Sequence, residues 1–376
     1  MGIFDKRKKK SDLPSTNATA VQTSVNSSHP YYSLTSYMPM GAESRVYAQL
    51  RNAVPILDAA INKIVRLTEG FTFETGDDSL NESMNSYFEN INVGGNQRGL
   101  SAFISNYLNQ LLTFGTAIGE MVVSEQGLYA LYNSSLESIE LKRAENGIDV
   151  DFYNFGERLK YPNLILYSVL NPEPEKLCGT SLLSGLPFIS DILMKIYNTI
   201  GENWEHAGNI RYAVICKPSD SSDYSGASQQ AQTVAQAWKE AMDSSAVKDF
   251  VAVGDVSIKV IGADNEILDS EIPVRQLLEQ IVAKTGIPPF MLGLSWSSTE
   301  RMSTQQADIL TTELEAYRRI LTPVITKIGN MYLALNGIQC DLKVIWNKIT
   351  LQDEKDKAQA QLYMAQANKI NKEVEA

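Results

Sequence analysis

The sequence predicts an α+β protein with a large body and a small insert between two long helices. In the first half, apolar residues switch between the helical spacing of three to four and the strand spacing of two. In the second half, three amphipathic segments are separated by a strand-helix-strand region and by a proline-containing turn. The 376 residues, 44% hydrophobic and 20% charged, suffice for a sizeable core and for more than one substructure.

Residues 1–40 are predicted to form a disordered arm. The tip, MGIFDKRKKK, carries five basic side chains, and a stretch rich in Ser, Thr and Asn follows it without apolar periodicity. This stretch has no apolar segment with a cleavage motif, so it does not have the pattern of a secretory signal.

Helices begin the predicted α+β body, residues 41–183. Helical spacing starts at Arg45, and a break is expected at Pro55 because proline cannot continue the backbone hydrogen bonding of a helix. A second helix is expected over 79–91, and a third is expected to end at Gly115.

Strands complete the predicted body. Alternation around Gln126-Gly127 and around Asn146-Gly147 predicts two hairpins, and YPNLILYSV predicts a further strand. The prolines of NPEPEKLCGT then end this region, since proline cannot donate to a central strand ladder.

Two amphipathic helices are predicted to flank a compact insert. The insert, residues 209–262, is expected to contain strands on either side of one helix, and about 55 residues bury too little surface for independent stability. The first flanking helix, residues 184–208, has Pro187 in its first turn, where proline is tolerated, and the second helix lies within 263–285. Their apolar stripes are Leu186, Ile189, Leu193, Ile196, Ile200 and Trp204, and Leu277, Leu278 and Ile281.

A mobile loop is predicted over residues 286–303. The Ile-Pro-Pro sequence stops the preceding helix, and Gly293 with the serines of LSWSSTERMS favours mobility. A third helix, residues 304–336, is expected to kink at Pro323. Residues 337–376 combine an alternating strand, IQCDLKVIWN, with a polar, alanine-rich helix.

The side-chain inventory does not indicate an enzyme, a cofactor or a metal site. Neither His29 nor His206 belongs to a recognisable catalytic motif, and the sequence contains no pair of ligands at metal-binding spacing. Cys178, Cys216 and Cys340 are far apart and odd in number, which indicates thiols of a reducing compartment rather than a disulfide framework.

Charge and hydropathy argue against two further classes. A formal net charge of −11 disfavours a protein whose main role is to hold nucleic acid, although an acidic wall lets DNA slide past without sticking. The longest apolar runs are much shorter than the roughly 20 residues that a membrane-spanning helix needs, so no membrane association is expected.

The order of these elements resembles that of the portal proteins of tailed bacteriophages. The order and spacing of short stretches across residues 45–335 carry the resemblance. They are RNAVPILDAAINKI (51–64), LLTFGTAIGEMVV (111–123), CGTSLL (178–183), NWEHAGNIRYAVI (203–215) and GIPPFMLG (286–293).

In that family the subunit forms a ring, usually of twelve copies, at one capsid vertex, and double-stranded DNA passes through its channel during packaging and ejection. The resemblance implies a structural subunit without catalytic activity. Its implied partners are other copies of itself, the major capsid protein, the terminase large subunit, a head-tail connector and the passing DNA. It implies a location in the virion after assembly in the bacterial cytoplasm.

The resemblance also implies roles for the segments. The stripes of the two flanking helices, which would form the stem, would be subunit interfaces, and residues 286–303 would form a tunnel loop projecting into the channel. The other implied parts are a wing (41–183 and 304–336), a clip (209–262) and a short crown (337–376). The implied channel residues are Leu294, Ser295, Trp296, Ser297, Ser298, Thr299, Glu300, Arg301 and Met302.

Two other classes remain open from the sequence. One is a capsid or connector component that assembles through the same apolar stripes but encloses no DNA. The other is a metal-dependent DNA-processing enzyme, which requires a cleavage activity that the side-chain inventory does not suggest.

Overall fold

The computed structural model describes residues 22–23, 43–174, 176–208, 211–216, 228–229, 231–236, 239, 256–261, 270–294 and 300–349. The chain divides into two compact units. The first, called the body here, comprises Met1–Ser190 and Glu279–Ala376, and the second unit comprises Asp191–Leu278. The boundaries between them fall inside the two helices that flank the predicted insert.

The helices predicted at the start of the body are confirmed. Pro55 occupies the first position of a helix, where its missing N–H costs nothing, and this separates two helices as expected. The Asp77 carboxylate caps the next helix by accepting a hydrogen bond from the Ser79 N–H at 2.9 Å, and Gly115 ends the fourth at φ 78°. These helices are α1 (Glu43–Ala53), α2 (Pro55–Thr68), α3 (Asp78–Asn90) and α4 (Leu100–Phe114).

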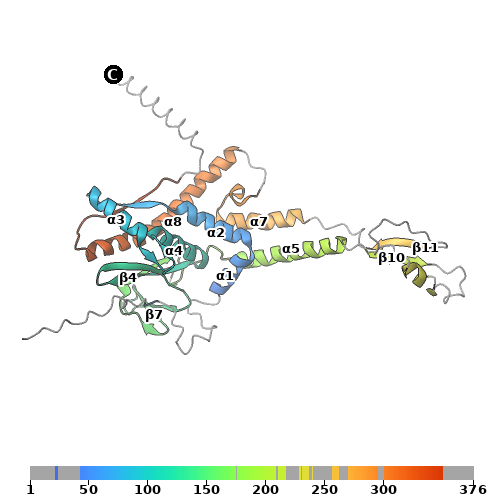
Figure 1. Ribbon diagram of the computed structural model, residues 1–376, viewed down its shortest axis with the longest axis horizontal. Coiled ribbons are helices and arrows are strands. Elements are labelled where there is room, and N and C mark those ends of the chain that lie inside the picture. Colours follow the sequence, from blue (N-terminus) through green and yellow to red (C-terminus); the bar gives the residue numbers. More distant parts are fainter. Residues whose placement is uncertain are drawn as a thin grey trace, which may run out of the picture. The chain divides into compact units, whose positions relative to one another are not determined.

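A five-stranded sheet of order β3-β2-β5-β4-β9 forms the centre of the body. The hairpin predicted at Gln126-Gly127 is confirmed as the β4–β5 pair, and the last strand, β9, pairs with β4 in antiparallel register. Helix α4 packs on β4, as Figure 1 shows. The strands are β2 (Asn92–Val93), β3 (Gln97–Arg98), β4 (Thr116–Ser124), β5 (Gly127–Asn133) and β9 (Ile165–Val169), which follows the short 3-10 helix η1 (Pro162–Leu164).

A three-stranded antiparallel sheet accompanies the central one. It contains the second predicted hairpin, β6 (Ile139–Arg143) with β7 (Val150–Asn154), and the short strand β8 (Glu157–Arg158). Its inner side chains join those of β4 and β9 in one apolar cluster, so the two sheets share a core. The cluster consists of Ile118, Leu136, Ile139, Phe152, Leu159 and Ile165.

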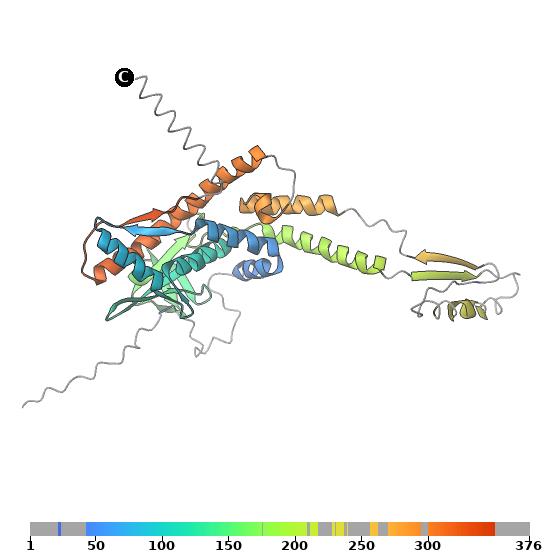
Figure 2. The ribbon, with the colours of Figure 1, turned by 45° about the horizontal axis from the view of Figure 1, so that its top comes forward.

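The C-terminal elements return to the body. Helix α8 (Glu300–Leu335) contains Pro323, and it is followed by β12 (Lys343–Trp346). Strand β12 pairs antiparallel with β1 (Phe71–Glu74), as Figure 2 shows. The strand expected at the start of residues 337–376 therefore completes a sheet of the body, and the polar helix expected after it lies outside the described residues.

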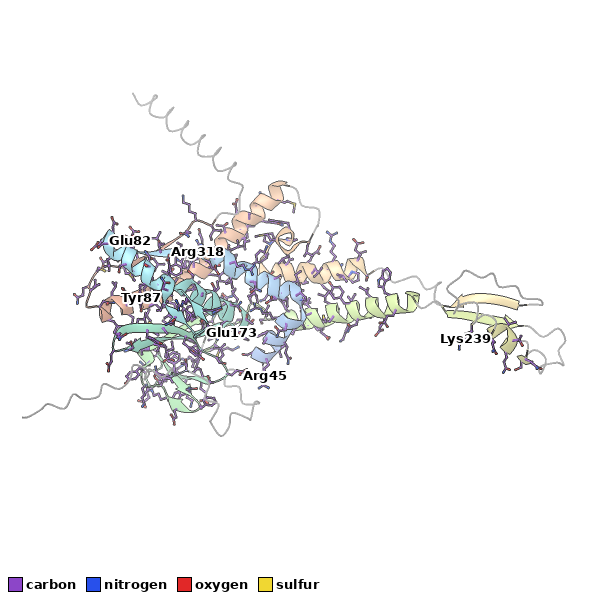
Figure 3. All side chains as sticks on the ribbon, viewed as in Figure 1. Arg45, Glu82, Tyr87, Glu173, Lys239 and Arg318 are labelled. Atoms are coloured by element: carbon purple, nitrogen blue, oxygen red, sulfur yellow. The ribbon has the colours of Figure 1, made fainter. Side chains whose placement is uncertain are left out.

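One buried arginine joins three parts of the body. Arg318 of α8, labelled in Figure 3, lies within the body. It donates to the carbonyl oxygens of Thr68 and Glu69, at the end of α2, each at 3.2 Å, and to that of Asn347 at 2.6 Å. Burial lowers the pKa of its guanidinium, which nonetheless stays protonated, and the group lies 4.9 Å from the ring of Trp346. Carbonyls that a helix end leaves unpaired are thereby satisfied from a distant element.

Two of the stretches that carry the family resemblance meet in space. The Gly179 N–H donates to the Thr116 hydroxyl at 3.0 Å, and the Leu170 N–H donates to the Gly115 carbonyl at 2.8 Å. A Cβ atom at Gly179 would lie 2.2 Å from the Gly115 oxygen, so only glycine permits this approach.

The second unit holds a pair of antiparallel strands, β10 (Arg211–Cys216) and β11 (Val256–Ile261), as expected for the insert. Residues 228–229, 231–236 and 239 are helical, where the sequence predicts a helix. The flanking helices are α5 (Leu186–Gly208) and α7 (Glu271–Thr285), both where predicted. A further strand of the insert, expected from the apolar run DFVAVG at 249–254, lies outside the described residues.

The N-terminal segment differs from the expected disordered arm at one point. Gln22 and Thr23 are placed on the body, where both donate hydrogen bonds to the carboxylate of Glu120. Their partners lie almost a hundred residues away in the sequence, so no local pattern could predict this contact. The rest of residues 1–42 lies outside the described residues.

Candidate assembly and channel surfaces

The predicted stripe of α5 divides into covered and uncovered side chains. Leu186 and Leu193 are buried, whereas Trp204 is 66% exposed. Ile189, Ile196 and Ile200 are half-buried. The buried pair therefore contributes to the fold of a single chain, and the exposed surface increases toward the C-terminal half of the helix.

Aromatic side chains enlarge the uncovered surface of α5. Tyr197, 45% exposed, precedes Trp204 by seven residues, so the two share one face about two turns apart. Phe188 is also exposed, but its spacing from Trp204 places it on a different face. Tyr197 lies outside the predicted stripe, which follows residues at three-to-four spacing, although the aromatic pair at i and i+7 is readable from the sequence.

The polar side of α5 carries an exposed ion pair. Lys195 Nζ lies 2.6 Å from a carboxylate oxygen of Asp191, one turn earlier. Exposed pairs of this kind contribute at most a few tenths of a kcal/mol, about 0.3–0.5. Helix α5 therefore has one polar face and one apolar face, and the apolar face is only partly covered.

Helix α7 shows the same division on a smaller scale. Of its predicted stripe, Ile281 is fully buried, and Leu277 and Leu278 are half-buried. Ile272, in the first turn, is 63% exposed and was not part of the predicted set. A side chain as covered as Ile281 has no surface to offer to a partner, so it belongs to the core of this chain.

The predicted channel loop begins with an ordered turn. A short 3-10 helix, η2 (Pro289–Leu292), follows α7, and Gly293 ends it at φ 77° while its N–H donates to the Phe290 carbonyl at 3.2 Å. Gly293 therefore supplies a left-handed conformation here, which is a different role from the predicted mobility. Leu294 is half-buried, and its N–H donates to the Pro289 carbonyl.

The end of the predicted loop is helical. Glu300, Arg301 and Met302 form the first turn of α8, so this helix begins earlier than the sequence indicated. Met302 is exposed. Ser295, Trp296, Ser297, Ser298 and Thr299 lie outside the described residues.

Several ionisable side chains of the body have shifted pKa values, and their burial in the packed core explains these shifts. Burial raises the pKa of Tyr167 and of Tyr317 to about 12 and lowers the pKa of Lys327. Lys327 Nζ donates to the Ile165 carbonyl at 2.7 Å, and the Tyr107 hydroxyl, whose pKa burial also raises, donates to the Ala117 carbonyl. Each of these last two bonds joins a helix to a strand.

Within the described ranges, no three His, Cys, Asp or Glu side chains lie close enough together to hold a metal ion. In the same part of the chain, no helix has both the length and the apolar character to cross a membrane. The features that call for a functional explanation are therefore the partly covered helices α5 and α7 and the turn that leads into α8.

The described chain thus combines an α+β body with an insert between two helices whose apolar faces are partly exposed. No family model and no curated protein matches the sequence. Solved structures do share the fold. A chain from the neck of an empty gene transfer agent particle, computed with C6 symmetry, is similar at a TM-score of 0.62 and 15% identity over 86% of this chain and 90% of that one.

Two further structures are similar. A chain from the neck of the native gene transfer agent particle, computed with C12 symmetry, has a TM-score of 0.60 and 15% identity over 85% of this chain and 88% of that one. A portal protein of the HK97 phage family from Corynebacterium diphtheriae has a TM-score of 0.42 and 10% identity, covering 80% and 94%. The resemblance to phage portal proteins that the sequence indicated is confirmed, at the level of the fold.

Proposed function

We propose that this protein is a portal subunit, which assembles as a ring at one vertex of a phage or phage-like capsid. The observation that carries the proposal is the fold, which this chain shares over 85–86% of its length with chains from particle necks. The C12 symmetry used for one of those necks supports a ring of twelve copies. Closed rotational assembly through one repeated contact fits a chain whose helices carry uncovered apolar side chains.

In this proposal the uncovered face of α5 contacts the next copy. Tyr197 and Trp204, with the half-buried Ile196 and Ile200, form a surface of aromatic and aliphatic groups that the single chain leaves open. Large aromatic side chains supply much of the binding energy at protein interfaces. Three of the predicted interface residues, Leu186, Leu193 and Ile281, are instead buried within the single chain.

The proposal includes a DNA channel. Residues 286–303 would form the tunnel loop, and a net charge of −11 suits a wall along which DNA slides without sticking. Residues 209–262 would form the clip that docks the terminase motor and the head-tail connector. Residues 41–183 and 304–336 would form the wing that contacts the major capsid protein, and residues 337–376 would contribute the crown. The protein would have no enzymatic activity and would be located in the virion.

Electron microscopy of the purified protein at several concentrations, with mass photometry of the same samples, tests the ring. We expect closed rings with an axial hole wide enough for a DNA duplex. Rings or clusters without a hole would favour a connector that encloses no DNA, and monomers at every concentration would contradict the proposal.

Loop replacement tests the channel. Replacing residues 295–299 with a Gly/Ser segment of equal length should leave rings intact but impair DNA packaging or retention, because the loop would no longer contact DNA. The matched control replaces the hairpin turn at 145–148, which is far from α8 in the sequence. Unchanged packaging by the loop variant would refute the tunnel-loop assignment.

A further inference from the structure

The described part of the N-terminal arm fills a specific site on the body. The backbone N–H of Gln22 donates to Oε1 of Glu120 at 3.0 Å, and that of Thr23 donates to Oε2 at 3.0 Å. The side chains add a bond from Gln22 Nε2 to Oε1 at 3.1 Å and one from Thr23 Oγ1 to Oε2 at 2.8 Å. Both carboxylate oxygens are thus bonded by the arm.

The position of Glu120 makes these bonds important. It lies on β4, in the central sheet, and only 2% of the residue is exposed while Gln22 and Thr23 are in place. A carboxylate so covered is costly unless donors replace the water that it loses. The arm supplies two backbone and two side-chain donors, so the site is complete only when the arm occupies it.

The body also recognises the backbone of the arm. Asn154 Nδ2 donates to the Gln22 carbonyl at 2.6 Å, and the Tyr161 N–H donates to the Gln22 side-chain oxygen at 3.1 Å. Ser134 Oγ lies 2.6 Å from Thr23 Oγ1, and Thr23 is fully buried. The site, next to a cavity of about 450 Å³, therefore binds a short polar segment mainly through main-chain groups and a small hydroxyl.

The arm can make the same bonds with another copy. Residues 24–42 connect Thr23 to α1, and this length of chain can span at most about 65 Å. Every copy presents an identical segment and an identical site, so exchange around a ring leaves no site empty. The five basic side chains of the tip are also attracted to other copies of a chain with net charge −11.

We propose that, in the assembled ring, Gln22 and Thr23 of each copy occupy the Glu120 site of its neighbour. This inference rests on the proposed ring. Exchange preserves every hydrogen bond described above and adds a link between copies, in addition to the contact through α5. The partner is thus a second copy of this chain, which contributes two residues to a site that is incomplete without them.

Disulfide trapping distinguishes exchange from docking within one chain. Thr23→Cys and Ser134→Cys are introduced separately into a background in which Cys178, Cys216 and Cys340 are replaced by Ser, and the two single variants are co-expressed. After mild oxidation of the assembled protein, exchange predicts a covalent dimer on a denaturing gel that reductant removes. A chain with both cysteines should give a ladder of covalent oligomers.

Mass photometry of the same samples separates failure of the inference from failure of the ring. Rings whose doubly substituted chains run only as internally linked monomers would overturn arm exchange and leave the proposed function standing. Monomers throughout, with internal links only, would contradict both.

Two further substitutions, made in the chain that carries both cysteines, test the role of the Glu120 carboxylate. Added to the doubly substituted chain, Glu120→Gln should lower the yield of covalent oligomers several-fold, because the amide NH2 group replaces one of the two oxygens that accept from the arm. Glu125→Gln, an exposed position in the β4–β5 turn, should leave the yield unchanged. Equal yields for both variants would overturn the role of Glu120.

Discussion

Helices α4 and α5 both have an apolar stripe in the sequence, yet the structure treats the stripes differently. In α4, Phe103, Tyr107 and Leu111 are fully buried, and the helix contacts α2, β4 and β5. On the apolar face of α5, Tyr197 and Trp204 are 45% and 66% exposed. The difference shows that the stripe of α4 is covered within one chain, whereas α5 leaves apolar surface exposed, as the proposed ring contact requires.

The elements that surround each helix explain why the stripe of α4 is buried and that of α5 is partly exposed. A helix against a sheet buries its whole stripe, and its polar groups can be satisfied locally, as the hydrogen bonds of Tyr107 to the Ala117 carbonyl and to Ser168 show. For α5, the side chains that a single chain leaves open are aromatic, which is the residue class enriched at protein interfaces. The comparison can be tested at three levels.

The largest effect is expected in the core around α4. Phe103→Ala should lower the free energy of unfolding by about 3–5 kcal/mol, because it leaves a cavity under the central sheet. Phe188→Ala on α5 should change it by less than about 0.5 kcal/mol, because that ring is already exposed. Chemical denaturation of both variants measures the contrast, and equal losses would show that the two helices do not differ in this way.

An intermediate effect is expected where α8 joins α2. Arg318→Met should cost about 2–4 kcal/mol, since three carbonyl oxygens lose a charged donor in a buried place. Arg319→Met is the matched control, because the neighbouring arginine is exposed. A loss no greater than that of the control would show that water replaces Arg318 at little cost.

The smallest effect on the single chain, and a clear one on assembly, is expected at Trp204. Trp204→Ala should change the free energy of unfolding by less than about 0.5 kcal/mol but weaken association by about 2 kcal/mol, roughly 30-fold in concentration. Lys195→Ala, on the polar face, serves as the control. Mass photometry of a dilution series measures both variants, and ring formation by Trp204→Ala at the wild-type concentration would place the interface elsewhere.

Local features were determined by the sequence itself. The break at Pro55, the end of α4 at Gly115, both hairpins of the body and the positions of α5 and α7 all follow from neighbouring residues, since backbone constraints and the period of apolar side chains act within a few positions. The order of the elements was enough to indicate the portal family, and the solved neck structures bear out the fold.

Only the tertiary structure decided which distant segments meet. Strand β1 pairs with β12, Arg318 reaches the end of α2, and Glu120 accepts the N–H groups of Gln22 and Thr23. The same holds for which parts of a stripe are covered, as in the contrast between Leu193 and Trp204. These partners are chosen by the burial and hydrogen bonding of the whole fold, and nothing in the local spacing of residues encodes a contact across almost a hundred positions or more.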